Sequence, residues 1–177
     1  GCVRPQNQDI YHIEKLDGST MLCVVCDGMG GAAGHPFIGM DREDLSYFLR
    51  ASVVQNYSAV TAACMMTKKS VFDEVGGFDE AFAVTFNDVD YCLKVRKSGK
   101  LVVYTPFATL YHHESKSRGL DDNPEKQKRL KDEAKLFEGR WADILENGDP
   151  YFNRNLNNRD PYFILKNWKD VLKENKK

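Results

Sequence analysis

The stretch from Asn87 to Tyr104 constrains the fold more than any other part of the sequence. It begins with NDVDYCLKVRKSG (87–99), in which acidic residues precede basic ones and a glycine closes the run. This charge order is typical of an α-helix, and Asn87 or Asp88 is the expected N-cap. The next residues, KLVVY (100–104), have the β-branched, apolar character of a buried strand. A helix that leads directly into a buried strand predicts a domain in which helices cover a sheet.

The remaining sequence predicts further short strands and helices around that unit. The expected elements are a β-hairpin over 10–27, a short helix around 45–54, a buried strand SAVTAACMMT (58–67), a helix KKSVFDEVG (68–76), a second short strand after Pro106, a long amphipathic helix over 124–146 and a last helix over 167–177. We therefore expect an α/β or α+β fold with a mixed sheet, flanking helices and an added N-terminal β-hairpin.

Composition narrows the choice of partners and compartment. The chain has 177 residues, enough for one domain, and its 25 basic and 26 acidic side chains leave a net charge of −1. This balance does not indicate nucleic acid as a partner, and no apolar run is long enough to span a membrane. The five cysteines include the pair Cys23 and Cys26, which lie in a strand-like run without a second pair to complete a zinc site. We expect free thiols in a reducing, cytoplasmic setting.

Residues 1–34 carry a motif of their own. Arg4 is followed by an N-x-D motif that ends at Asp9, and the predicted hairpin ends in DGMGG, which begins at Asp27. This pattern resembles the start of the metal-dependent Ser/Thr protein phosphatases of the PPM type. The resemblance implies that Arg4 holds a phosphate, while Asp9, Asp27 and the Gly28 carbonyl organise two metal ions. The alternative is a hairpin whose acids face solvent, and we expect no complete phosphatase because that family's downstream aspartates are not found here.

From residue 35 to about residue 165 the motifs change. In order, they are HPFIGM, QNYSAVTAACMMTKKSVFDEVGGFDE, FNDVDYCLKVRKSGKLVVYTPFATLYHHESKSRG and DPYFNRNL. Together they resemble the acceptor-side half of a family-2 glycosyltransferase with the GT-A fold, closest to bacterial enzymes of polysaccharide biosynthesis. The chain is therefore expected to be a chimera, with a phosphatase-like hairpin over 1–34 and a glycosyltransferase half with a helical tail over 35–177.

The glycosyltransferase resemblance assigns roles to three acids. An inverting transfer needs a carboxylate that takes the proton of the acceptor hydroxyl, and the family places this base in an acidic pair at a helix start. The matching residue is Asp88, with Asp90 as its neighbour in substrate binding and Asn87 in place of the more usual Glu. Asp79, in the GGFDE turn, is the expected contact for an acceptor hydroxyl. The alternative is that these acids only complement the helix dipole.

The same resemblance implies a metal and a diphosphate. In YHHESKSRG, either His112 or His113 is expected to hold a divalent ion, Mn²⁺ or Mg²⁺, and Arg118 is expected to lie near the diphosphate of the nucleotide-sugar. The alternative is a histidine pair at the surface.

The helical spacing of Trp141 with the other apolar residues of the 124–146 helix favours a place in the core. The alternative is a platform on which a sugar ring stacks.

Three functions follow as hypotheses. The first is a glycosyltransferase-derived domain that binds a saccharide acceptor and a nucleotide-sugar but is inactive alone, because the nucleotide-binding half with its D-x-D motif is not found. The second is a non-enzymatic module that oligomerises through an exposed sheet edge formed by the 58–67 strand. The third is a remnant of a metal-dependent phosphatase, which rests on residues 1–34 only.

Overall fold

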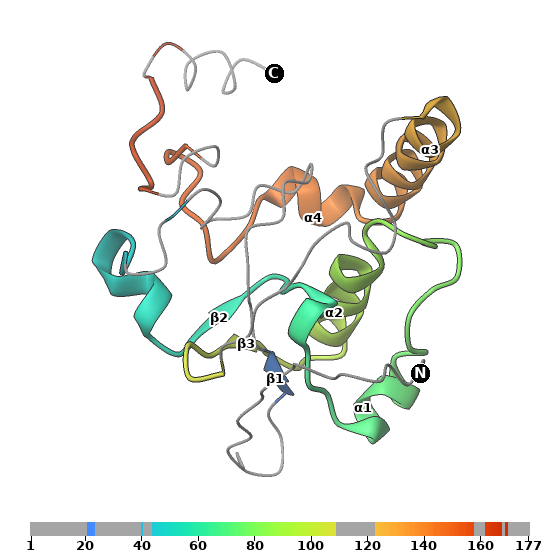
Figure 1. Cartoon of the computed structure of the whole chain (residues 1–177), viewed down its shortest axis with the longest axis horizontal. Helices are drawn as coiled ribbons and strands as arrows, with labels where there is room; N and C mark the ends of the chain where they lie inside the picture. The colour runs from blue at the N-terminus through green and yellow to red at the C-terminus, as the bar shows by residue number, and fades with distance from the viewer. Residues whose placement is uncertain are drawn as a thin grey trace.

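The computed structural model describes residues 21–23, 40, 44–108, 123–157, 162–167 and 169. Within them, the elements in chain order are β1 (Met21–Cys23), the 3-10 helix η1 (Tyr47–Ser52), β2 (Gln55–Tyr57), the 3-10 helix η2 (Ala62–Cys64), α1 (Lys69–Glu74), α2 (Asn87–Lys97), β3 (Val102–Tyr104), α3 (Pro124–Arg140) and α4 (Ala142–Asn147) (Figure 1). No helix among these described residues is long and apolar enough to cross a membrane.

The strands form a small mixed sheet in the order β1-β3-β2. β3 pairs in parallel with β1, where Leu22 lies opposite Val103, and antiparallel with β2, where Asn56 lies opposite the same residue. All of β3 is buried, as expected for the central strand of a sheet covered by helices. The prediction of a mixed α/β arrangement is therefore confirmed for the described residues.

Helix α2 lies between the sheet and α3 (Figure 1). Its residues Tyr91, Cys92 and Val95 pack with the strands in a first core cluster, whose other buried members are Tyr57, Val60, Val71, Val102 and Tyr104. On another face of α2, Leu93 packs with Phe82, Phe137 and Trp141 in a second cluster. The prediction that Trp141 belongs to the core is confirmed, since the residue is only 4% exposed.

The helices α1 and α2 agree with the sequence, but the predicted N-cap of α2 is wrong. The N-cap residue is Phe86, whose backbone is left-handed at φ 64°, and its side chain makes no capping hydrogen bond. The side chains of Asn87 and Asp88 instead each accept a hydrogen bond from the next backbone N–H, at 2.7 and 2.8 Å. The chain therefore enters α2 through an unusual backbone conformation that the sequence pattern did not predict.

Three other predicted elements need correction. The 58–67 segment is not a strand, because η2 interrupts it and its only ladder contact is a bridge residue at Met65. The helix predicted around 45–54 is the 3-10 helix η1, with left-handed φ values at Phe48 and Leu49. The helix predicted over 124–146 is divided into α3 and α4 at Trp141, where φ is −115° and ψ is 25°.

Several predictions concern residues outside the described part of the chain. These are the first strand and turn of the 10–27 hairpin, the strand predicted after Pro106 apart from residues 107 and 108, and most of the helix over 167–177. The division of the chain at residue 34 also lies there and stays a prediction. Of the cysteines whose side chains are described, Cys64 and Cys92 are both free thiols, as expected.

Candidate functional site

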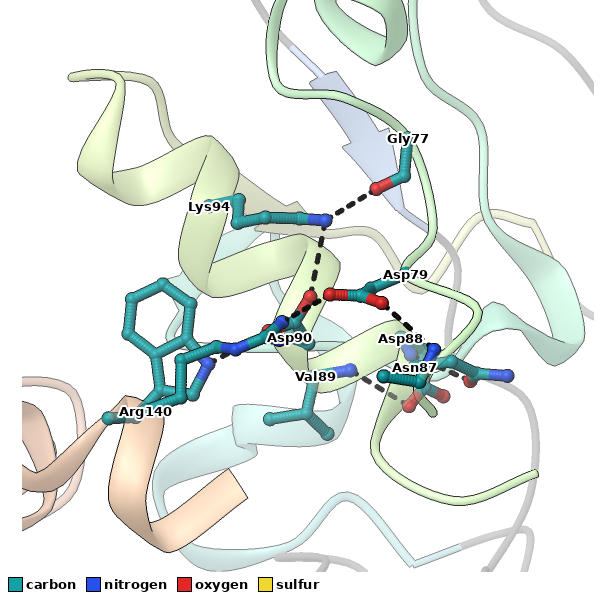
Figure 2. A network of polar contacts seen from close by, with 10 residues as sticks. Gly77, Asp79, Asn87, Asp88, Val89, Asp90, Lys94 and Arg140 are labelled. Carbon is teal, nitrogen blue, oxygen red and sulfur yellow. Dashed lines mark hydrogen bonds and ion pairs between the residues drawn. The ribbon is translucent and has the colours of Figure 1, made fainter. Parts of the chain in front are cut away.

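The three acids predicted from the glycosyltransferase resemblance lie together at the N-terminal end of α2. Figure 2 shows Asp79 beside the first turn of this helix, with Asp88 and Asp90 on the helix itself and Arg140 reaching in from α3. The other predicted site residues lie outside the described part of the chain; they are Arg4, Asp9, Asp27, Gly28, His112, His113 and Arg118.

Asp90 is the buried centre of this group. Its side chain is 0% exposed. Its Oδ1 accepts hydrogen bonds from Arg140 Nη1 at 2.9 Å and from the indole Nε1 of Trp141 at 3.0 Å. Its Oδ2 forms an ion pair with Lys94 Nζ at 3.2 Å, without the alignment of a hydrogen bond. Asp90 therefore links α2 to α3, and its predicted contact with substrate stays a prediction.

Asp79 lies at the rim of the same network. Its Oδ1 accepts a hydrogen bond from the backbone N–H of Ala81 at 2.9 Å, and its Oδ2 lies 2.7 Å from Arg140 Nη1. The hydrogen bond from the Ala81 N–H and, as a smaller cause, the one from Arg140 hold the pKa of Asp79 below its usual range. The side chain is 32% exposed, so a ligand can still reach it.

Asp88 has different partners from the other two acids. Its Oδ2 accepts a hydrogen bond from the backbone N–H of Ala62 at 3.0 Å, and its Oδ1 accepts one from the N–H of Val89 at 2.8 Å. The residue is half-buried, and neither bond comes from a cation. A carboxylate offers about four acceptor positions, so Asp88 keeps capacity for a ligand hydroxyl.

The glycines before Asp79 allow a sharp turn that brings it to α2. Gly76 and Gly77 have φ values of 80° and 64°, a region that favours glycine. A Cβ on Gly77 would lie 2.7 Å from the Phe72 ring. The Gly77 carbonyl accepts a hydrogen bond from Lys94 Nζ at 2.6 Å. The turn therefore depends on glycine for both its backbone conformation and its close packing.

Sequence reasoning missed the cations of this site. Lys94 stands four residues after Asp90, a spacing that favours an ion pair on a helix, so its role had a detectable signal. Arg140 is 50 residues from Asp90 in sequence, and no local pattern indicates their contact. Among the described residues, no group of three His, Cys, Asp or Glu side chains is arranged to hold a metal ion.

Comparison with known proteins gives sequence relatives but no family model and no solved structure that matches. The chain is 45% identical over 150 residues to the uncharacterized protein y4gI of Sinorhizobium fredii; the match covers 84% of this chain and 16% of that protein. It is 37% identical over 141 residues to the O-antigen biosynthesis protein RfbC of Myxococcus xanthus, covering 79% of this chain and 11% of that protein.

A third relative carries the name of an enzyme. Over 62 residues the chain is 39% identical to the N-acetylglucosaminyl-diphospho-decaprenol L-rhamnosyltransferase of Mycobacterium tuberculosis, covering 35% of this chain and 20% of that protein. The chain thus spans no more than about a fifth of these relatives. It is related to glycosyltransferase-like proteins, which agrees with the resemblance from residue 35 onward.

Proposed function

We propose that the chain is the acceptor-side part of a family-2, GT-A glycosyltransferase, in which Asp88 is the base. The observation that carries this proposal is the position of the Asp88 carboxylate. It stands at the start of α2, half-buried, and among the described residues it accepts hydrogen bonds from the backbone N–H groups of Ala62 and Val89. The similarity to a rhamnosyltransferase and to an O-antigen biosynthesis protein supports the same reaction class.

The proposed reaction is an inverting sugar transfer. The acceptor hydroxyl oxygen attacks the anomeric carbon of a nucleotide-sugar and passes its proton to Asp88. The bond from the anomeric carbon to the diphosphate breaks, and the nucleoside diphosphate leaves with the bonding electrons. A base must lie within hydrogen-bond reach of the hydroxyl, and the acceptor capacity that Asp88 keeps beyond its two backbone bonds supports this role.

The neighbouring acids suit supporting roles. Asp90 is fully buried and paired with Arg140 and Lys94, so its carboxylate has little exposed surface for contact with a ligand. Asp79 is partly exposed beside the helix start, so we assign it a contact with an acceptor hydroxyl. The resemblance further suggests that His112 or His113 holds Mn²⁺ or Mg²⁺ and that Arg118 lies near the donor diphosphate, both outside the described residues.

The test is to join the chain to the nucleotide-binding half of a family-2 glycosyltransferase. The joined protein would be assayed for sugar transfer with a panel of nucleotide-sugars that includes a nucleotide-activated L-rhamnose. We expect transfer that is abolished by Asp88→Asn but retained by Asp143→Asn, a matched change at an exposed acid of α4. Transfer that persists in Asp88→Asn would remove Asp88 from the reaction.

One observation favours a second candidate, a non-enzymatic module that associates with itself. Large apolar side chains between residues 45 and 54 are exposed; they are Leu45, Tyr47, Phe48, Leu49, Val53 and Val54. Phe48 is the most exposed of them at 81%, and a group of exposed apolar side chains is typical of an interaction surface. Light scattering should then show a dimer or larger species that Phe48→Ser returns to the monomer. A monomer at high concentration would contradict this candidate.

A further inference from the structure

One face of α3 contacts the segment that connects Asp79 to α2. Glu133, Phe137 and Arg140 are spaced i, i+4 and i+7, so they lie in a row on the helix. Each of them contacts a residue between 79 and 86. This segment carries Asp79 at its start and leads into Asp88 at its end, so α3 spans the whole connection between the two acids.

Glu133 binds the backbone of the segment. Its side chain is buried, with only 5% of the residue exposed, and its Oε2 accepts a hydrogen bond from the N–H of Thr85 at 2.7 Å. Its Oε1 forms an ion pair with Arg129 Nε at 3.7 Å, a separation too long for a hydrogen bond. A buried carboxylate is costly unless it has partners, and Glu133 has two, the Arg129 guanidinium and the Thr85 N–H, which donates the hydrogen bond.

Phe137 holds the aromatic residues of the same segment. Its ring stacks on Phe86 with centroids 4.9 Å apart and an interplanar angle of 19°, and it meets Phe82 edge-on at 6.2 Å. The guanidinium of Arg140 lies over the Phe82 ring, 4.8 Å from its centroid. Backbone and side chains of the segment are thus both fixed by α3.

The residue that these contacts hold is in an unfavourable conformation. Phe86 has φ 64°, which a residue with a bulky side chain seldom adopts and which persists only when its surroundings enforce it. It directly precedes Asn87 and Asp88. The direction in which the chain enters α2 at Phe86 therefore sets where the Asp88 carboxylate points.

We propose that α3 is a positioning helix, whose residues Glu133, Phe137 and Arg140 hold the 79–86 segment so that Asp88 lies against the Ala62 N–H. The three residues act through the segment and do not touch the reacting atoms. The purpose of this arrangement rests on the function proposed for Asp88, but the arrangement itself can be tested without any sugar.

The test is amide hydrogen exchange, measured by NMR on the whole chain. In Glu133→Ala we expect exchange of the Thr85 amide and of the Ala62 amide to become about tenfold faster, the effect of losing a hydrogen bond to a charged group. The Ala62 N–H donates to Asp88 and not to α3, so a purely local role of Glu133 would leave it unchanged. The amide of Val95, inside α2, should keep its protection.

Matched variants complete the design. Glu133→Gln keeps an acceptor for the Thr85 N–H and should restore most of the protection at Ala62, whereas Glu138→Ala removes an exposed acid of α3 and should change nothing. If Val95 also loses protection in Glu133→Ala, the fold has loosened as a whole. The test is then made with Arg140→Gln instead, because the Arg140 side chain is 30% exposed and its replacement disturbs the core less.

The outcomes separate this proposal from the one on function. Normal protection at Ala62 with a freely exchanging Thr85, or an unchanged Ala62 in Arg140→Gln, would overturn the positioning role of α3. Either result would leave the transfer assay on Asp88 unaffected. Conversely, transfer by the joined protein that persists in Asp88→Asn, together with coupled exchange at Thr85 and Ala62, would keep α3 as a positioning helix and reject Asp88 as the base.

Discussion

The clearest prediction compares two acids that stand two residues apart, Asp90 and Asp88. Asp90→Asn keeps the shape of the side chain but removes the charge that pairs with Arg140 and Lys94. Breaking a buried ion pair typically costs ~3–5 kcal/mol. The two cations are 30% and 22% exposed and can regain part of their hydration, so we expect a loss of about 3 kcal/mol in the free energy of unfolding.

Asp88→Asn should cost much less. Asp88 gives up a favourable charge at the helix start, worth ~0.3–1 kcal/mol, and one of its two bonds from backbone N–H groups. The Asn side chain still offers one acceptor oxygen, and the site is half-buried, so water can replace the lost partner. We therefore expect a loss of about 1 kcal/mol.

Urea denaturation followed by far-ultraviolet circular dichroism near neutral pH would measure both changes. Asp143→Asn, in exposed α4, is the control and should stay within ~0.5 kcal/mol of the wild type. A loss in Asp88→Asn as large as that in Asp90→Asn would mean that Asp88 is a structural cap. The argument that Asp88 is available to a substrate would then be refuted.

Three further predictions concern other groups of the described region. The pKa of Asp79 is lower in the folded than in the unfolded chain, so this acid stabilises the fold at pH values above its unfolded pKa. The stabilisation is lost as the pH falls through the folded pKa. Arg140→Gln should make the free energy of unfolding, measured in urea titrations, less dependent on acid pH. Burial raises the pKa of Cys92 to about 12, so an aryl disulfide reagent at mildly alkaline pH should label it only after unfolding, and prompt labelling would contradict its burial. Gly77→Ala, at φ 64°, should destabilise the chain by about 1–3 kcal/mol, whereas the helical and unobstructed Gly139→Ala should be neutral or slightly stabilising in the same assay.

Local patterns were sufficient where the structure is locally determined. The helix α2 follows from acids in its first turn and bases in its last, and β3 follows from a β-branched run that the helices bury. The resemblance also drew attention to Asp79, Asp88 and Asp90, and these three acids lie together beside the start of α2 (Figure 2). The roles assigned to these carboxylates stay predictions.

Long-range contacts explain what the sequence pattern missed. The periodicity over 124–146 is continuous, but the helix breaks at Trp141, whose indole donates a hydrogen bond to Asp90, 51 residues away along the chain. The 58–67 run has the composition of a strand, yet the Ala62 N–H donates to the Asp88 carboxylate at the start of η2. In both places a side chain of α2 takes part in the local structure of a distant segment, which periodicity cannot report.

Backbone strain alone does not identify the important position. Five described residues other than glycine have positive φ, namely Ser46, Phe48, Leu49, Phe86 and Phe163. Phe48 is 81% exposed, so its conformation has little surrounding structure to enforce it. Phe86 differs from Phe48 because a stacked ring and a buried carboxylate, both from α3, hold its side chain and the N–H of the preceding residue. Strain that is enforced in this way, one residue before Asn87-Asp88, is the kind expected where a side chain must be held in place before its ligand arrives.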